Sequence, residues 1–397
     1  MNAARRTAAS VTEPADGAAA AASPGSDRPA KLDRLRAVLR ARAAEALVLT
    51  SPEMMAWLLD GARTQVPPNG PSVMAAAITA DDEQLVCAHN EIGRMAAEEL
   101  PGGTTPEPVP WFEPLTGGLP VPDGTAVLAE ADVVDELRAA RASLLPLELA
   151  RYRSLCRDAA TVVTDVVSAA RPDHTERQVA SALAAGLVAV GAEPLVLLVG
   201  GGRRLLHRHP LPTHAPVGDR FLAVVCARRH GMIANLSRWR SFDAGFRDEA
   251  GRENPGDTVD AARRLFEVEA DALDATRAGA SLADVFAALR RAYAAHGFDP
   301  DEWTCHHQGG PTGYLGRDPK VSHTSTGSVV AGQAFAWNPS APGVKVEDTV
   351  LTGPAPDGAT PDGPAIPDPA GMEVLTVDPR WPTVSVRGRP RPLILHG

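Results

Sequence analysis

The sequence has few cysteines, no long apolar run and no excess of basic residues, and each shortage argues against a class of protein. Its four cysteines are far apart and show no C-x-x-C spacing, which fits a reduced cytoplasmic chain better than a disulfide framework. No run of about 18 apolar residues occurs, so we expect no membrane-spanning helix. A net charge of -10 argues against nucleic acid as a partner, because phosphate binding needs clustered Lys and Arg.

What is present suffices for two globular domains, since the chain has 397 residues and 44% hydrophobic content. Residues 1–30 are rich in Ala, Ser, Pro and Gly and lack the apolar core of a signal peptide, which predicts a disordered tail. A cleavable targeting segment is the alternative there. Residues 352–371 are rich in Pro and Gly, which predicts a flexible loop.

Residues 31–145 alternate between helical and extended patterns. Apolar residues at positions 32, 35, 38 and 39 share one helical face, and a second helix fits residues 90–100. Strand patterns cover residues 46–50, 73–78, 84–87 and 126–129. This alternation predicts a small α/β domain.

Residues 146–397 show two helix pairs, each followed by strands. The first pair is a long helix to about residue 170 and a helix that opens with the capping box Thr175 to Gln178. The second covers about 258–277 and 282–296, where Ser281 is the N-cap and Gly297 the C-terminal cap. Strand patterns lie at 194–199, 221–226 and 232–238. The pattern predicts an α+β domain with an internal duplication in outline.

Polar residues then gather around one glycine-rich turn. His306 and His307 precede Gly309-Gly310, and two later apolar runs lead to Asn338 and to Glu347. This spacing is typical of strands that deliver polar groups to one cleft. Caps and ordinary loop contacts are the alternative interpretation.

These motifs resemble the C-terminal half of the pita-bread family, which includes methionine aminopeptidase, aminopeptidase P, prolidase and creatinase. The family's metallopeptidases carry His-x-x-Gly-His-x-x-Gly, then a strand ending in Glu-Pro, then Gly…Glu-Asp-x-Val. Residues 306–313 keep the first His and both glycines, and Glu347-Asp348 keeps the last motif. The resemblance covers about residues 31–397 and implies a pita-bread domain at 146–397, preceded by a creatinase-like N-terminal domain at 31–145.

The same resemblance implies that most metal ligands are missing. Peptidases of the family clamp paired ions with Asp, Asp, His, Glu and Glu. Those positions correspond here to Val224, Asn235, Gly310, Asn338 and Glu347, so only Glu347 is a ligand of the family type. Because neutral amides and one carboxylate hold a divalent ion poorly, we expect no catalytic metal and no cofactor.

Creatinase, a metal-free member of the family, suggests what such a site can still do. Its catalytic His precedes a Gly-Asp turn and a strand, and His209 precedes Gly218-Asp219 in a comparable place. One of its two important glutamates matches Glu347, whereas the other falls on Ser237. Creatine itself is therefore not the substrate that we expect.

The predicted site joins three catalytic residues to a substrate-binding set. Histidine exchanges protons near neutral pH, so a His paired with Glu347 could activate water. Neutral amides could hold substrate polar atoms or a developing oxyanion. The predicted catalytic residues are His209, His306 and Glu347, and the predicted substrate-binding residues are His307, Asn235, Asn338, Arg238 and Arg208.

Several structural alternatives remain open for these residues. His209 could be a loop histidine, and His307 could face away from His306, as neighbours on a strand do. Glu347-Asp348 could form a buried ion pair with Arg238 or Lys345. Cys226 and Cys305 are more typical of inert small side chains than of nucleophiles.

Three functions fit this reading. The first is a metal-independent, creatinase-like hydrolase that cleaves a C–N or amide bond of a small polar substrate. The second uses the same site for elimination, cyclisation or isomerisation, and the third is a non-catalytic binding module. Retention of His209, His306 and Glu347 together favours an enzyme. We expect a cytoplasmic homodimer, since family members with this domain plan form dimers.

Overall fold

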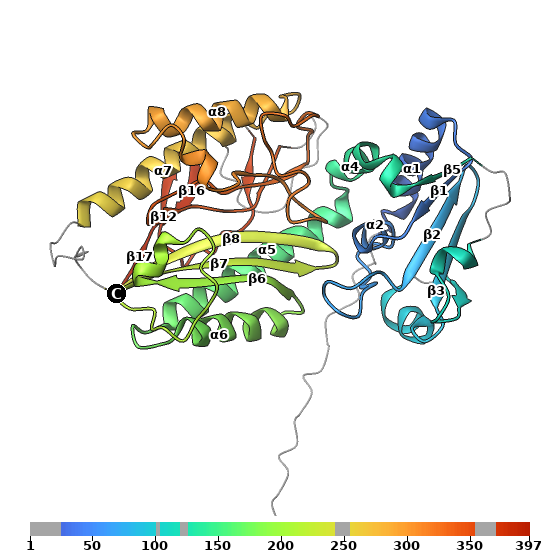
Figure 1. The fold of residues 1–397 in the computed structure, drawn as a ribbon, viewed down its shortest axis with the longest axis horizontal. Coiled ribbons are helices and arrows are strands. Elements are labelled where there is room, and N and C mark those ends of the chain that lie inside the picture. The colour runs from blue at the N-terminus through green and yellow to red at the C-terminus, as the bar shows by residue number, and fades with distance from the viewer. Residues whose placement is uncertain (1–24, 101–103, 120–125, 243–254, 354–370) are drawn as a thin grey trace, which may run out of the picture.

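The computed structural model describes residues 25–100, 104–119, 126–242, 255–353 and 371–397, which form a smaller and a larger lobe side by side (Figure 1). The predicted tail and the predicted loop at 352–371 lie almost wholly outside these residues and stay predictions. The boundary between residues 145 and 146 also stays a prediction.

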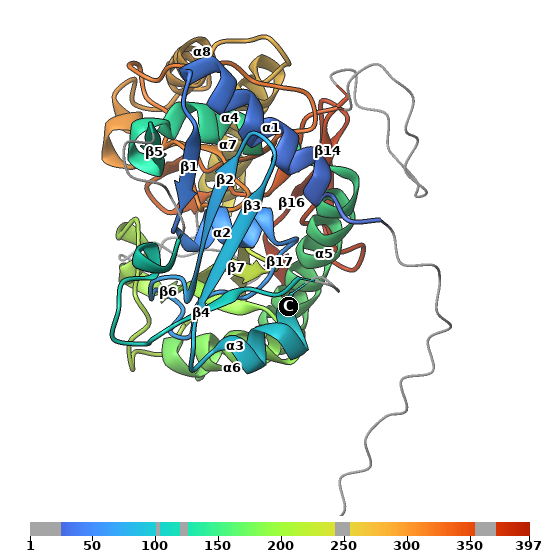
Figure 2. The same ribbon diagram turned by 90° about the vertical axis from the view of Figure 1, so that its right-hand side faces the viewer.

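The smaller lobe is built on a five-stranded sheet in the order β4-β3-β2-β1-β5. β1 pairs antiparallel with β2 and parallel with β5, while β3 pairs antiparallel with β2 and parallel with β4. This sheet lies in front of the larger lobe in Figure 2. The strands are β1 (Ala46–Leu49), β2 (Met74–Thr79), β3 (Glu83–Ala88), β4 (Glu107–Val109) and β5 (Val127–Ala129).

Short helices complete the smaller lobe. The buried Leu35 and Leu39 show that α1 packs through the apolar face that the sequence predicts. Ser51 caps α2 by accepting a hydrogen bond from the backbone N of Met54. The helices are α1 (Arg28–Arg42), α2 (Pro52–Leu58), α3 (Ile92–Arg94), which continues into a π-helical turn at Met95–Glu99, and α4 (Val134–Ala142).

The larger lobe begins with a helix pair and a sheet in the order β17-β8-β7-β6. The capping box at Thr175 forms as predicted and starts α6. Ala223, Val225 and Leu236 point from the sheet into the core shared with both helices, so the opposite face of β7 and β8 turns toward the middle of the lobe. The elements are α5 (Pro146–Ala169), α6 (Glu176–Ala189), β6 (Glu193–Gly201), β7 (Arg220–Arg229), β8 (Met232–Ser241) and β17 (Leu395–His396).

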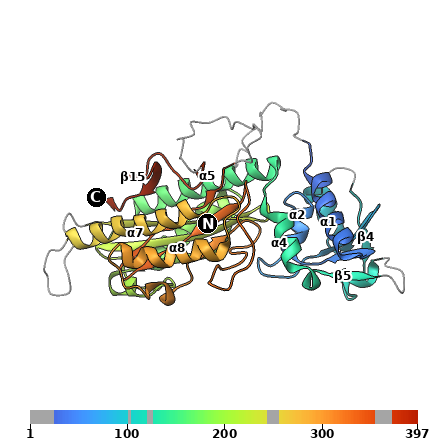
Figure 3. The same cartoon turned by 90° about the horizontal axis from the view of Figure 1, so that it is seen from above.

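A second helix pair and a second sheet, in the order β14-β13-β10-β9, complete this lobe. Ser281 caps α8 as predicted. α7 and α8 run side by side along the lobe (Figure 3), on the side opposite to α5 and α6 (Figure 1). The elements are α7 (Pro255–Ala275), α8 (Leu282–Ala295), β9 (Gly309–Pro311), β10 (Ala334–Trp337), β11 (Ser340–Ala341), β12 (Val344–Lys345), β13 (Val350–Leu351), β14 (Glu373–Val374), β15 (Thr383–Val386) and β16 (Arg389–Pro392).

Two sheets enclosed by two outer helix pairs confirm the predicted fold class, with a smaller α/β domain in front. The expected helices and strands are present within a few residues, except that the helix expected at 90–100 is the short α3 and its π-helical turn. None of the helices in the described ranges is long and apolar enough to cross a membrane.

Candidate active site

The inner face of β7 and β8 carries the first two positions of interest. Register pairs Val224 with Ser237 and Cys226 with Asn235, so all four side chains share the face away from α5 and α6. Asn235 is fully buried, and its amide nitrogen donates to Thr312 Oγ1 at 3.0 Å. The amide oxygen of Asn235 is thereby turned toward a cation from another segment.

That cation is Arg317, which lies at the centre of a buried ionic cluster. Its Nη1 donates to Asn235 Oδ1 at 3.0 Å, and its Nη2 donates to Glu347 Oε1. Lys345 Nζ lies 3.4 Å from the other oxygen, Glu347 Oε2. The side chains of all three ionic partners are at most 7% exposed, so both carboxylate oxygens are neutralised away from water.

The charges in this cluster keep Glu347 ionised. Burial alone would raise the pKa of Glu347, but Lys345 and Arg317 together hold that pKa below its usual value. Burial lowers the pKa of Lys345, and the carboxylate of Glu347 opposes this shift. The open alternative of a buried ion pair between Glu347 and Lys345 is therefore what the structure shows.

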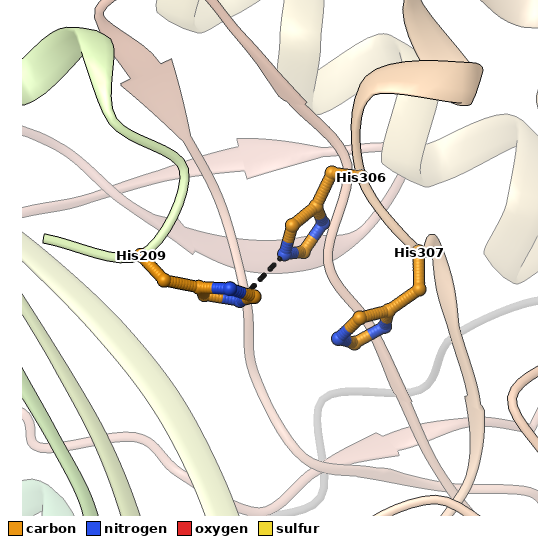
Figure 4. Close-up of side chains that lie close together, drawn as sticks. All are labelled: His209, His306 and His307. Carbon is orange, nitrogen blue, oxygen red and sulfur yellow. Dashed lines mark hydrogen bonds between the residues drawn. The ribbon is translucent and has the colours of Figure 1, made fainter.

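Three histidines meet beside this cluster (Figure 4). His306 Nε2 and His209 Nε2 are 2.9 Å apart, although the residues are 97 positions apart in sequence. His306 and His307 stack with ring centroids 4.4 Å apart, and His307 also lies 6.1 Å from His209. His307 therefore joins the other two rings instead of facing away, because these residues precede β9 and are not part of a flat strand.

Burial and nearby cations favour the neutral form of His306 and His307, and the pKa of the more exposed His209 is shifted in the same direction. Burial, followed by the charge of Lys345, lowers the pKa of His306 to about 2 and also lowers the pKa of His209. Burial and then Arg317 lower the pKa of His307 to about 4. A hydrogen bond between two neutral Nε2 atoms requires one ring to carry its proton on Nε2 and the other on Nδ1. The pair thus keeps one ring nitrogen with a free lone pair.

Several buried polar atoms around these groups have no hydrogen-bond partner. They are His306 Nδ1, His307 Nδ1, Asn338 Oδ1 and Ser237 Oγ. His306, Asn338 and Ser237 are each at most 8% exposed. A buried polar atom without a partner is rare in a folded protein, and an unfilled ligand site is one reason for it.

The two predicted substrate-binding arginines are both engaged elsewhere in the protein. Arg238 lies on the opposite face of β8 from Asn235, where it pairs with Asp348 at 3.0 Å and donates to Thr376 O. Arg208 pairs with Glu302 and donates to Ser340 Oγ at 3.1 Å. The positive charge of Arg208 still contributes to the low pKa of His306.

Sequence reasoning missed Arg317 altogether and named Lys345 only as an ion-pair partner. Glu347 was expected to pair with a histidine, whereas within the described residues its side chain contacts Arg317 and Lys345. One signal could have found Arg317. A buried carboxylate that lacks metal ions needs another cation, and Arg317 follows directly on the glycine-rich segment 309–316.

The two enclosed sheets and this central site define the class as a pita-bread protein. The sequence model of the metallopeptidase family M24 matches residues 150–354, which is just over half of the chain. The chain therefore belongs to the M24 family. No curated protein sequence matches it.

Solved structures of similar fold cover most of this chain at low identity. The prolidase from Pyrococcus horikoshii OT3 shares 17% identity with a TM-score of 0.66, covering 88% of this chain and 99% of that one. Dipeptidase PepE from Mycobacterium ulcerans shares 18% with a TM-score of 0.66, covering 93% and 97%. The N-terminal domain of the FACT complex subunit SPT16 from Cicer arietinum shares 12% with a TM-score of 0.57, covering 88% and 97%. At these identities the likeness shows the fold alone.

The paired metal ions implied by the family do not fit the residues present. Val224 and Gly310 offer no ligand atom, and Asn235 donates through its amide nitrogen and accepts from Arg317 through its oxygen. Two fixed cations already lie against Glu347, the one carboxylate left at the five family positions. A divalent ion there would face Arg317 and Lys345 at close range.

The three histidines are the one group of side chains, within the described residues, whose ligand atoms could surround a metal ion, all within 4.8 Å of one another. Metal-binding histidines almost always donate their second ring nitrogen to a carboxylate or carbonyl. Here Nδ1 of His306 and Nδ1 of His307 have no such partner, and the charges of Lys345 and Arg317 disfavour a cation. Among the described residues, the cluster therefore lacks the supporting hydrogen bonds that usually accompany histidine metal ligands.

Proposed function

We propose that this protein is a metal-independent hydrolase that cleaves a C–N or amide bond of a small polar substrate. The observation that carries the proposal is the pair of cations, Arg317 and Lys345, that contact Glu347, the one carboxylate present at the five positions that correspond to the family's metal ligands. Beside them, His209 and His306 form a neutral hydrogen-bonded pair. The site thus offers fixed positive charge and a base without a bound ion.

The proposed roles follow from these positions. His209, the exposed member of the pair, takes a proton from water as the water attacks the substrate and returns it to the leaving nitrogen, while His306, whose low pKa makes it a weak base, positions the His209 ring. Arg317 and Lys345 stabilise negative charge that develops on the substrate oxygen. Glu347 holds these two cations in place, which differs from the expected role as partner of a histidine. His307 and Asn338 hold substrate polar atoms through Nδ1 and Oδ1.

The same groups would also serve a non-hydrolytic step. A neutral histidine pair next to fixed cations can remove a proton alpha to a carbonyl, as elimination, cyclisation or isomerisation requires. The two reactions differ in whether water is consumed. Turnover in water enriched in oxygen-18 separates them, because only hydrolysis incorporates the label into the product.

A non-catalytic binding module is the second candidate, and one observation favours it. Both oxygens of Glu347 are taken by cations, so this carboxylate is not available as a base. The similarity to the SPT16 N-terminal domain concerns the fold and adds nothing about activity. The neutral histidine pair is the feature that a pure binding module does not need.

The test combines metal analysis with a substrate panel. Purified full-length protein is assayed for zinc, manganese, iron and cobalt, and then for turnover of small amides, guanidines and dipeptides with and without chelator. We expect no stoichiometric metal and chelator-resistant turnover that is lost in His306→Gln and kept in His323→Gln, whose histidine is exposed. One or two metals per chain, removable with loss of activity, would overturn metal independence. Ligand binding without turnover would favour the binding module.

We also propose a cytoplasmic homodimer of two-domain chains divided near residue 145. The scattered cysteines and the acidic charge of -10 support a reducing compartment and a small-molecule substrate instead of nucleic acid. Sedimentation analysis tests the dimer. Limited proteolysis tests the division, since a cut near residue 145 should release two folded pieces.

A further inference from the structure

A pocket with a volume of about 720 Å³ lies between the two domains and shares no lining residue with the histidine cluster. The smaller domain contributes Glu53, Thr64 and Glu98 to its wall, and the larger domain contributes Leu195, Arg228 and Leu315. The turn of the β7–β8 hairpin points toward this junction near α2 (Figure 1). Pockets of this size at domain junctions are common binding sites for small ligands.

The walls of this interdomain pocket are held in place by close packing. His230 and Gly231 form the hairpin turn, and a Cβ on Gly61 would lie 2.6 Å from the Cβ of His230. A Cβ on Gly231 would lie 2.7 Å from Ala56 and 2.9 Å from the ring of Tyr314. The turn is thus wedged between the domains, and the pocket is formed before any ligand arrives.

The basic residues of the pocket already have partners. Arg63 donates to Glu99 through Nε at 2.6 Å. Arg228 donates to Glu193 and to Pro68 O, the latter at 2.7 Å. Arg229 pairs with Asp158 at 2.7 Å and donates to Val190 O. These arginines therefore leave little positive charge for an anionic ligand.

Two of the four acidic residues in the lining, Glu53 and Glu98, are less well satisfied. Glu53 is half-buried and has no hydrogen bond or ion pair to any residue in the described ranges. Glu98 has only a contact of 4.0 Å with Arg63. Within the described residues, Glu53 therefore leaves a negative charge without a cationic partner beside the apolar surfaces of Ala62, Leu195 and Leu315.

An independent feature in the same wall points to a ligand. Thr64 is 2% exposed, lines the pocket, and its hydroxyl Oγ1 has no hydrogen-bond partner. A buried hydroxyl without a partner destabilises the fold, so its persistence suits a position that a ligand completes. Its two lone pairs and one proton can meet either an ammonium or a hydroxyl group.

We propose that the interdomain pocket binds a small primary amine with an apolar body. The ammonium group lies between Glu53, Glu98 and the hydroxyl of Thr64, and the apolar body contacts Leu195 and Leu315. Such a ligand touches both domains and fastens them together. Leu315 is two residues from Arg317, so occupancy also braces the segment that carries this cation into the active site.

The experiment uses isopentylamine as the probe, with the full-length protein and isothermal titration calorimetry. Isopentanol and isovalerate have the same apolar body without the positive charge and serve as ligand controls. We expect saturable binding of the amine alone, together with a rise in the unfolding temperature. No saturable binding, or equal binding of the alcohol or the acid, overturns the proposal.

Three variants locate the binding, and one serves as the matched control. Glu53→Gln should weaken binding about tenfold through loss of the charge, and Thr64→Val about threefold through loss of the hydroxyl. Leu195→Trp, at a partly exposed position, should block the pocket without disturbing the buried core. Glu113→Gln removes an exposed carboxylate outside the pocket and should leave binding unchanged. Binding that survives both Glu53→Gln and Leu195→Trp would overturn the site, whatever the fate of the proposed hydrolase activity.

Discussion

A single buried carboxylate explains much of what distinguishes this site. Glu347 is 3% exposed, and an isolated carboxylate at that depth would cost several kcal/mol. Arg317 and Lys345 provide the compensating charge that metal ions provide in the family's peptidases. Both oxygens of Glu347 therefore have a cation as partner within this chain.

Removing Arg317 tests this compensation directly. Arg317→Met should lower the free energy of unfolding by about 2–4 kcal/mol, because Glu347 then keeps only Lys345 as a partner. Urea unfolding of the single variant and of Arg317→Met with Glu347→Gln measures the effect. The double variant should recover part of the loss, since the buried charge is gone. A double variant no more stable than Arg317→Met would contradict the argument.

The histidines should make the protein sensitive to acid. The low pKa of His306, about 2, means that the folded state leaves this ring neutral at pH values where the unfolded state protonates it. Stability therefore falls as the pH drops below about 6.5, by about 1.4 kcal/mol per pH unit for each such ring. For His307 this loss of stability ends near its folded-state pKa of about 4, because below that pH the folded state binds the proton as well.

Chemical unfolding of the wild type, His306→Gln and the control His323→Gln at pH 7, 6 and 5 measures this contribution. The free energy of unfolding of His306→Gln should fall less steeply as the pH decreases, because up to one proton fewer is taken up on unfolding. His323→Gln should follow the wild type, because His323 is exposed. Parallel curves for all three proteins would show that His306 titrates normally in the folded state.

The elements of the fold follow closely from local sequence signals. Thr175 and Ser281 begin α6 and α8 because their side chains satisfy free backbone N–H groups. Gly297 takes a φ of +74°, as the C-terminal cap predicts. The strand patterns at β6, β7 and β8 are apolar enough to be read directly.

The site was less predictable because it depends on contacts between distant segments. His209 and His306 are 97 residues apart, and their bond follows from how the loop before β7 approaches β9. Family resemblance suggested that both lie at the site, but only the structure pairs them. Arg317 lies in a loop with no periodic pattern, so nothing local reveals that it reaches Glu347. Charged residues that pair between distant segments follow no fixed spacing in the sequence, so the sequence alone does not reveal the pairing.

The strand β9 shows why the family's metal site is difficult to restore. Gly310 has a φ of +142°, and a Cβ there would lie 2.6 Å from both Pro319 O and Val321 Cγ2. The histidine that the family carries at this position would therefore meet the backbone of the neighbouring segment. The packing around Gly310 therefore leaves no room for a side chain at this position.

Gly310→His should thus lower stability by about 2–4 kcal/mol through overpacking and backbone strain. Thermal unfolding with and without added zinc measures this loss, and we expect zinc not to restore it. Gly316→Ala is the control, because a Cβ at Gly316 meets nothing within 4 Å. A stable Gly310→His protein that gains zinc would show that the site still accepts metal.

At the scale of the whole molecule, a buried ionic network fastens the two domains. Lys31 of α1 donates to Asp60 at 2.7 Å and lies 3.5 Å from Glu148 of α5. Tyr314 donates to the same Glu148 oxygen at 2.7 Å. Lys31 and Glu148 are fully buried, so the network links the smaller domain to the segment that leads to Arg317.

Substitution of Lys31 should therefore lower the local stability of both domains. Lys31→Met leaves Asp60 and Glu148 buried without their cation and should cost about 3–5 kcal/mol, whereas Lys320→Met, at an exposed lysine, should cost almost nothing. Hydrogen exchange should rise around α1 and also at residues 312–317, because Tyr314 shares Glu148 with Lys31. If exchange rises in the smaller domain alone, the network holds α1 but does not support the active-site segment. Equal protection of that segment in both lysine variants would direct attention to the ion pairs of Arg138 and Arg141 with Asp318, which also join the smaller domain to the segment that carries Arg317.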